Sequence, residues 1–296
     1  MSNSNNINQI KNLNDALIYI KTELKKLYDN PEIQSFTNII FQHLLHFSKI
    51  DILIKTDTEL TNHTKIQIIK IVEQLKKHKP IQYIIGETEF YDLKFTVSPQ
   101  VLIPRPETEE LVKWIIDDSS AKQNTEILDI GTGSGCIAIA LAKNILSSQI
   151  YAVEKHEGAL AIAKQNAKFN NAKINFINDD ILNYDKTKYS NKFDVIVSNP
   201  PYVRELEKKL MNKNVLDYEP HSALFVSDSN ALIFYDAIAN FAVKHMKKTG
   251  KLYFEINEYL DKQLKDLLLK KGYKNIIVRK DINDRKRMLR AEIIRN

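Results

Sequence analysis

The 296-residue chain has a single cysteine, Cys136, so no disulfide can form within it, and an intracellular setting is favoured. Its seven histidines are scattered, whereas a zinc site needs several Cys or His ligands, which argues against a metal centre. No apolar run approaches the roughly 18 residues that a membrane-spanning helix needs. The Asn/Ser-rich residues 1–9 lack the basic and apolar parts of a signal peptide. We therefore expect a cytoplasmic protein with no metal and no membrane partner.

The net charge is small outside the last third of the chain, because basic and acidic residues nearly balance there. Of the formal net charge of +6, residues 1–90 carry +1, residues 91–202 carry −2 and residues 203–296 carry +7. A basic face in the last third would steer the protein toward an RNA-rich partner, and hence toward the ribosome. The other interpretation is an ordinary lysine-rich surface. The charge alone does not decide between them.

The first 85 residues have helical apolar spacing. The pattern predicts helices over residues 14–28, with Asn14 and Asp15 as the cap, over 31–47 and over 64–78. We therefore predict an N-terminal helical domain, residues 1–85, without a catalytic constellation of its own. Scaffolding and substrate recognition are both compatible with it, and we assign substrate recognition as its role.

A change of pattern follows this segment. Residues 90–97 are rich in aromatic and β-branched side chains around a turn at Asp92, which predicts a hairpin within a proline-punctuated linker, residues 86–106. A helix is expected over 107–117, at the start of a second domain, residues 107–296, and from about residue 126 the chain alternates between strand and helix. This alternation predicts an α/β fold with a doubly wound, mostly parallel sheet. The expected strands are 127–130, 149–153, 174–177, 193–197 and 251–256, with helices 136–145, 158–169 and 231–246.

Three of only seven glycines fall in one loop, which leaves the first of these strands and enters a helix. Glycine is needed where a backbone turns tightly and a ligand approaches its peptide groups. The spacing is Gly-x-Gly-x-Gly, unlike the Gly-x-Gly-x-x-Gly loop of nicotinamide oxidoreductases, and Glu154 ends the next strand, where a carboxylate can accept ribose hydroxyls. These features resemble class I S-adenosylmethionine methyltransferases, with their Rossmann-like fold. The resemblance implies that S-adenosylmethionine is held by Gly131, Thr132, Gly133, Ser134, Gly135, Glu154, Asp180 and Asn199.

The third strand is followed by an acidic pair, Asp179 and Asp180. In the methyltransferases that the chain resembles, a residue at this place lies against the adenine. Asp180 and its neighbour Ile181 are both candidates for that contact.

The segment Asn199-Pro200-Pro201-Tyr202 directly follows the fourth strand, at the edge of the sheet where doubly wound folds bind ligands. The NH2 group of an amide or aryl amine is a poor nucleophile because its lone pair is delocalised. The Asn199 side-chain oxygen and the Pro200 carbonyl can each accept a hydrogen bond from one N–H of this NH2 group, which aims the nitrogen lone pair at the methyl group. Tyr202 can pack against the flat substrate. We predict Asn199, Pro200 and Tyr202 as catalytic and all four residues as substrate-binding.

Further motifs make the chain similar to one family, the peptide chain release factor glutamine methyltransferases. They are residues 80–86 (PIQYIIG), 101–109 (VLIPRPETE) and 218–224 (YEPHSAL), besides the glycine loop and the Asn-Pro-Pro-Tyr segment. The resemblance implies methylation of the glutamine side-chain nitrogen, N5, in the Gly-Gly-Gln motif of release factors, with no nucleic acid required. Arg105 and Glu107 either shape the substrate entrance or serve the linker. Asn283 stands where the family often has glycine, which puts the conformation of the last hairpin in doubt.

Two other functions fit parts of the pattern. An adenine-N6 or guanine-N2 methyltransferase would use the same tetrapeptide, but a flipped base needs a basic groove, and residues 91–202 are slightly acidic. A non-enzymatic adenosyl-binding module would be expected to lose the tetrapeptide, which is intact here. Cys136 is expected to be a buried packing residue.

Overall fold

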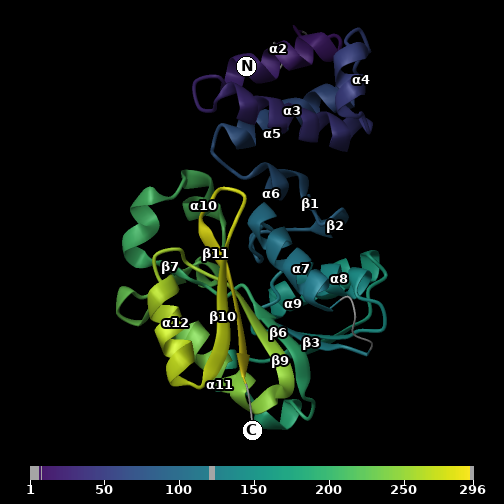
Figure 1. Cartoon of the computed structure of the whole chain (residues 1–296). Coiled ribbons are helices and arrows are strands. Elements are labelled where there is room, and N and C mark those ends of the chain that lie inside the picture. Colours follow the sequence, from purple (N-terminus) through teal and green to yellow (C-terminus); the bar gives the residue numbers. More distant parts are fainter. Residues whose placement is uncertain (1–6, 8, 120–123, 294–296) are drawn as a thin grey trace. The chain divides into compact units, whose positions relative to one another are not determined.

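The computed structural model describes residues 7, 9–119 and 124–293 (Figure 1). The chain divides into two compact units. One comprises Met1–Gly86 with Lys213–Tyr218, and the other Glu87–Asn212 with Glu219–Asn296. Within the described ranges, no helix combines the length and the apolar character needed to span a membrane.

The first unit is a bundle of helices around a shared apolar core that includes Leu13, Ile40 and Ile68. The predicted helices are confirmed, with shifted ends: the first is capped by Asn12, not Asn14, and ends at Leu24 because its C-terminal turn closes at Lys25. Three short helices, α4 (Lys49–Ile54), α6 (Ile81–Ile85) and α10 (Lys213–Tyr218), were not predicted because they are too short to show a helical period. The helices are α2 (Leu13–Leu24), α3 (Asn30–Leu45), α4 (Lys49–Ile54), α5 (Asn62–Leu75), α6 (Ile81–Ile85) and α10 (Lys213–Tyr218).

The second unit begins with the predicted hairpin, formed by β1 (Glu87–Phe90) and β2 (Leu93–Thr96). Tyr91 and Asp92 at its tip both have positive φ, 51° and 59°, the backbone that a two-residue turn between twisted strands requires. The hairpin starts three residues earlier than predicted. Because strand side chains alternate between faces, Phe90 and Phe95 meet edge to face and are buried.

A seven-stranded sheet forms the centre of the second unit, in the order β10-β11-β9-β6-β3-β4-β5. The strands from β9 to β5 are parallel, as predicted, whereas β11 is antiparallel to both of its neighbours. The last two strands were not predicted as elements. The bounds are β3 (Glu126–Ile130), β4 (Gln149–Glu154), β5 (Ile174–Asn178), β6 (Phe193–Ser198), β9 (Met246–Glu255), β10 (Tyr273–Lys280) and β11 (Lys286–Ile293), besides a short pair, β7 (Val203–Arg204) and β8 (Phe225–Val226).

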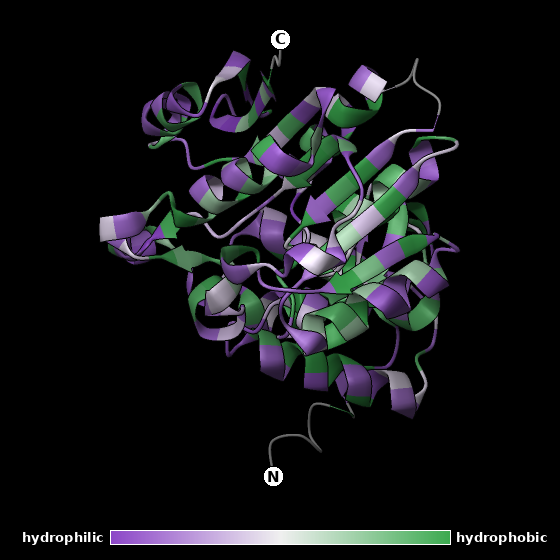
Figure 2. Ribbon diagram, turned by 90° about the horizontal axis from the view of Figure 1, so that it is seen from below, coloured by the Kyte–Doolittle hydropathy of each residue, from purple (hydrophilic) through white to green (hydrophobic). Residues whose placement is uncertain are grey.

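Helices cover both faces of this sheet (Figure 1). One face packs against α7 (Pro106–Ser119), α8 (Cys136–Asn144) and α9 (Glu157–Phe169), the other against α11 (Ile233–His245) and α12 (Asp261–Lys270). Successive residues of one strand serve different cores: Ile127 belongs to the first and Leu128 to the second. Apolar colour accordingly runs along the strands and the inward helix faces in Figure 2. Burial on both faces explains why these strands are continuous apolar runs.

The strand order places the site. The first parallel strand, β3, has β4 on one side and β6 on the other, so the chain changes direction across the sheet between β3 and β6. Doubly wound sheets bind ligands at the carboxyl ends of strands beside such a switch point. The glycine loop follows β3 and Asn199 follows β6, so the topology brings the two predicted motifs to the same edge.

Candidate active site

The glycine loop joins β3 to α8 through three residues with positive φ: Gly131 (74°), Gly133 (56°) and Gly135 (84°). Residues with a side chain rarely adopt this backbone conformation, so these positions require glycine. At Gly135 space is short as well, since an added Cβ would lie 3.0 Å from Cδ1 of Ile139 and 3.3 Å from Cβ of Ala163. The loop therefore lies tightly against α8 and α9.

Asp129 and Asn166 are two of the polar side chains that hold this loop. The Thr132 hydroxyl donates to Oδ2 of Asp129 at 2.6 Å, and burial raises the pKa of the Asp129 carboxyl to about 7, with the nearby Glu154 carboxylate adding to the shift. Asn166 of α9 donates from Nδ2 to the carbonyl of Ser134 at 2.9 Å, while its Oδ1 accepts the N–H of Thr96 at 2.7 Å. Asn166 thus ties the loop to the β1–β2 hairpin.

Glu154 lies at the end of β4 with only 7% of its surface exposed. Its Oε2 accepts the N–H of Gly133 at 3.0 Å and its Oε1 the N–H of His156 at 2.9 Å. A carboxylate has about four acceptor positions. Each oxygen therefore keeps one further position, the pattern needed to accept a pair of adjacent ribose hydroxyls.

The acidic pair after β5 is engaged in local contacts. Asp180 caps the short 3-10 helix Ile181–Asn183 by accepting the N–H of Leu182 at 3.0 Å, and pairs with Lys155 at 2.7 Å. Burial favours a higher pKa for its carboxyl, but these two contacts outweigh it and lower the pKa. Ile181 is nearly buried and is an apolar wall residue beside it.

One cavity of about 720 Å³ collects these parts, and ligand sites typically measure roughly 300–1,000 Å³. Gly135 and Tyr202 are not among its lining residues. The size, the acidic Glu154 and the apolar Ile181 together suit an adenosyl ligand. The predicted residues that do line it are Gly131, Thr132, Gly133, Ser134, Glu154, Asp180, Asn199, Pro200 and Pro201.

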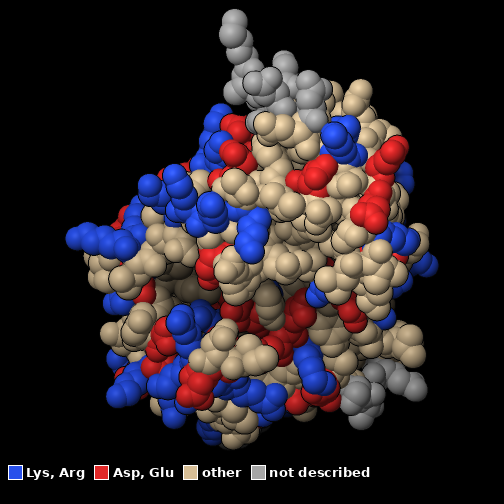
Figure 3. Space-filling view, turned by 90° about the horizontal axis from the view of Figure 1, so that it is seen from above, with Lys and Arg blue, Asp and Glu red and all other residues tan. Residues whose placement is uncertain are grey.

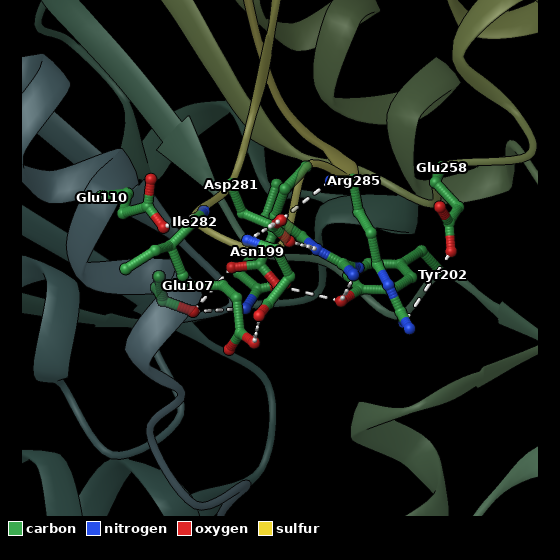
Figure 4. Close-up of polar contacts among 12 residues, drawn as sticks. Glu107, Glu110, Asn199, Tyr202, Glu258, Asp281, Ile282 and Arg285 are labelled. Atoms are coloured by element: carbon green, nitrogen blue, oxygen red, sulfur yellow. Dashed lines mark hydrogen bonds and ion pairs between the residues drawn. The ribbon is translucent and has the colours of Figure 1, made fainter.

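The Asn-Pro-Pro-Tyr segment leaves β6 at the rim of this cavity. Asn199 donates from Nδ2 to Oγ1 of Thr108, a long hydrogen bond of 3.4 Å. The Tyr202 hydroxyl donates to Oε1 of Glu255 at 2.9 Å and accepts from Nη1 of Arg287 at 3.3 Å. Burial and the Glu255 carboxylate raise the pKa of Tyr202 far above its ordinary value, so the phenol stays protonated. Figure 4 shows Asn199 and Tyr202 within this polar network.

The two linker residues that the sequence singled out have separate surroundings. Arg105 donates from Nη2 to Oε1 of Glu219 at 2.6 Å, and the N–H of Ile103 reaches Oε2 of the same carboxylate at 3.4 Å. Glu219, in the segment 218–224, is therefore the residue that ties that segment to the linker. Arg105 lines the cavity, whereas Glu107 lies outside it and contacts Asn283 at 3.5 Å.

The turn between β10 and β11 settles the effect of Asn283. Oδ1 of Asp281 accepts the N–H groups of Asn283 and Arg285, both at 2.9 Å, and the backbone closes between Asp281 and Arg285. The left-handed residue of this turn is Asp284, with φ of 61°, and Asn283 is not in that region. The chain therefore forms the hairpin without glycine at 283.

Cys136 is buried at the start of α8, and burial raises its thiol pKa to about 12. A thiol that stays protonated at neutral pH is a poor nucleophile, in keeping with the predicted packing role. No three potential metal ligands of the described residues cluster as a metal site would require.

Comparison with known proteins shows the family of the chain. The family model "PrmC N-terminal domain" matches residues 15–86, and "Methyltransferase small domain" matches residues 108–218. The release factor glutamine methyltransferase of Flavobacterium psychrophilum is 47% identical over 271 residues, covering 90% of this chain and 94% of the relative. The chain belongs to the release factor glutamine methyltransferase family. The enzyme of that name from Bacteroides thetaiotaomicron is 39% identical over 279 residues, covering 94% and 99%.

Membership of the release factor glutamine methyltransferase family confirms the resemblance drawn from the motifs, and makes the chain an enzyme that takes its methyl group from S-adenosylmethionine. A solved structure described as a methyltransferase from Pyrococcus furiosus covers 78% of this chain and 98% of its own, with a TM-score of 0.50 and 19% identity. That likeness supports the class I fold alone.

Three residues that hold the predicted motifs in place in this family member were not predicted from its sequence: Asn166, Glu255 and Arg287. Asn166 had a detectable signal, since it is a polar residue on the apolar face of α9, in step with Ala159 and Ala163. Glu255 had a weaker one, as an acid at the end of a buried strand. Arg287 had none, because its role depends on the unpredicted pairing of β11 with β9.

Proposed function

We propose that the protein transfers the methyl group of S-adenosylmethionine to the side-chain nitrogen, N5, of the glutamine in the Gly-Gly-Gln motif of a peptide chain release factor. One observation carries the proposal: Asn199 and Pro200, at the end of β6, line the same cavity as the glycine loop and Glu154, at the ends of β3 and β4. An acceptor pair for a flat NH2 group and a holder for an adenosyl ligand thus share one space. The close relatives named for this reaction support the choice of substrate.

Different residues of the cavity would bind different parts of the cofactor. Glu154 would accept the ribose hydroxyls, and the Gly131–Gly135 loop would lie against the methionine part, where glycines let the ligand approach the backbone. We propose that Ile181 packs on the adenine face. Asp180, whose carboxylate is held in place by Lys155 and Leu182, accepts a hydrogen bond from the edge of the ring. The bound cofactor supplies an electrophilic methyl group.

The residues of the chain contribute orientation. Oδ1 of Asn199 and the carbonyl of Pro200 would each accept one N–H of the glutamine amide, so that its nitrogen lone pair points at the methyl group. Holding the glutamine nitrogen and the methyl group in line removes the entropic cost of bringing the two together in the reactive orientation. A base is not required before transfer, since the proton becomes acidic once the nitrogen is alkylated. The neutral Asn199 is suited to a neutral amide, which a carboxylate there would disturb.

The partners follow from the substrate. We propose that the protein meets release factors in the cytoplasm, that no nucleic acid is required, and that the basic last third allows work close to the ribosome. The match of residues 15–86 to an N-terminal domain model of the same family supports a role of the first unit in recognising the release factor. Basic side chains on the face drawn in Figure 3 are interspersed with acidic ones, which is compatible with a protein partner.

The test is incubation with S-adenosylmethionine carrying a labelled methyl group and, in separate reactions, a release factor, the same factor with its motif glutamine changed to asparagine, RNA and DNA. Peptide mapping by mass spectrometry should place one methyl group on the motif glutamine of the unchanged factor alone. Label in the asparagine variant or in a nucleic acid would contradict the proposal.

A further inference from the structure

Behind Asn199, a short chain of hydrogen bonds leads away from the cavity to a buried carboxylate. Nδ2 of Asn199 lies 3.4 Å from Oγ1 of Thr108, and Thr108 donates to Oε2 of Glu255 at 2.6 Å. Thr108 sits in the first turn of α7 and Glu255 is the last residue of β9. Each is only 2% exposed. The two thus bring separate elements to the back of one functional side chain.

The direction of these bonds follows from the carboxylate. An ionised carboxylate only accepts, and a hydroxyl has one proton to give. The Thr108 proton is used toward Glu255 at 2.6 Å, so Thr108 presents only lone pairs to Asn199. The Asn199 amide must therefore turn its NH2 group to Thr108, and its Oδ1 to the other side.

Two further contacts favour the ionised, accepting form of Glu255. Its other oxygen, Oε1, receives the Tyr202 hydroxyl at 2.9 Å. Arg287 supplies positive charge at Tyr202 and is itself held by Asp281, with Nε 3.2 Å from Oδ2. Burial, with Glu107 adding to it, raises the pKa of Glu255 above its ordinary value, and Thr108, Tyr202 and Arg287 limit this rise. Figure 4 shows Asn199, Tyr202 and Asp281 within this group of polar contacts.

We propose that Glu255, acting through Thr108, is a positioning residue that orients the Asn199 amide so that its oxygen faces the substrate NH2 group. The inference rests on the proposed function, because orientation matters only if the substrate offers N–H donors. An inverted Asn199 would set its own N–H groups against those of the glutamine. The chain would then lose one of its two acceptors at the moment when the nucleophile must be aimed.

The kinetic test compares Thr108→Val, which removes the hydroxyl at nearly constant volume, with Thr108→Ser, which keeps it. We expect Thr108→Val to lower kcat for release factor methylation by roughly tenfold or more, with the Kd of S-adenosylmethionine changed less than threefold. Thr108→Ser should restore kcat to within about threefold of the parent. Glu255→Gln, whose amide can donate to Thr108, should resemble Thr108→Val.

A matched control separates positioning from packing. Thr125 is likewise buried, 1% exposed, and its hydroxyl has no hydrogen-bond partner among the described residues. Thr125→Val should leave kcat unchanged, whatever it does to thermal stability. An unchanged kcat in Thr108→Val, or a loss in Thr108→Ser as large as in Thr108→Val, would overturn the proposal.

A second measurement does not depend on activity. Neutron diffraction distinguishes nitrogen from oxygen and locates deuterons, so it reads the Asn199 orientation directly. We expect the deuterons of Nδ2 to point to Thr108 in the parent protein. Oδ1 facing Thr108 would refute the orientation even in an active enzyme, whereas the expected orientation in a protein inactive on release factors would refute the proposed substrate alone.

Discussion

The hydroxyl of Tyr202 lies 2.9 Å from Oε1 of Glu255, at the end of a different strand from the one that Tyr202 follows. The backbone carbonyl of Tyr202 also accepts a hydrogen bond, from Nδ2 of Asn257 at 3.0 Å. The last residue of the Asn-Pro-Pro-Tyr segment is therefore fixed at its side chain and its backbone. A tyrosine tied in this way holds Pro200 and Asn199 in place, besides any contact of its ring with substrate.

Tyr202→Phe separates these two contributions, because it keeps the ring and removes the hydroxyl. We expect a loss of about 1–3 kcal/mol in the free energy of unfolding, since a buried carboxylate loses a hydrogen bond, and a several-fold fall in kcat. Urea unfolding and initial rates measure the two. A phenylalanine variant with parent stability and parent kcat would show that only the ring matters.

Asn199→Ala removes the proposed acceptor for the substrate amide. We expect methyl transfer to become undetectable while the Kd of S-adenosylmethionine rises only a few-fold, since the other cofactor contacts remain. Calorimetry and a methyl-transfer assay on the same preparation are the measurements. Turnover at the parent rate would remove Asn199 from the mechanism.

Glu154→Ala should weaken cofactor binding. Loss of one good charge-assisted contact to the ribose raises the Kd by roughly tenfold or more, about 1.4 kcal/mol. Glu154→Gln is the matched variant: it keeps one carbonyl acceptor, so its Kd should fall between those of the alanine variant and the parent. Equal affinities of all three in a calorimetric titration would disprove the ribose assignment.

The adenine contact can be assigned by a pair of substitutions. If Ile181 packs on the ring, Ile181→Ala should raise the Kd of S-adenosylmethionine and of S-adenosylhomocysteine alike, by roughly tenfold, through lost apolar contact. Asp180→Ala should have the smaller effect, since its carboxylate already serves Lys155 and Leu182. The reverse ranking would give the main contact to Asp180.

Asp129 gives a pH signature. Burial raises its pKa from 3.8 to about 7, so between these values the folded state binds more protons than the unfolded state. Its contribution to stability therefore falls as pH rises through this window, by up to about 1.4 kcal/mol per pH unit. The unfolding free energy of Asp129→Asn minus that of the parent should rise from pH 4 to 7 and then level off. A flat difference would show an ordinary pKa.

Local sequence signals were sufficient for the parts of the site that lie at strand ends. The glycine loop, Glu154 and Asn199 each follow a buried strand, and a parallel sheet necessarily brings such positions to one edge. Glu255 and Thr108 could not be joined in the same way, because their contact links residues 147 positions apart through the packing of α7 on β9. The antiparallel pair β10–β11 was missed as well, since its exposed positions interrupt the apolar pattern.

The central claim is that Asn199 and Pro200 hold a flat amide beside a methyl donor bound over the glycine loop. Its most direct test is a crystal structure with S-adenosylhomocysteine and a peptide containing Gly-Gly-Gln. The account predicts the glutamine amide nitrogen within about 3.2 Å of both Oδ1 of Asn199 and the Pro200 carbonyl, on the side of the ligand sulfur. An adenosyl ligand outside this cavity, or a glutamine bound elsewhere, would contradict it.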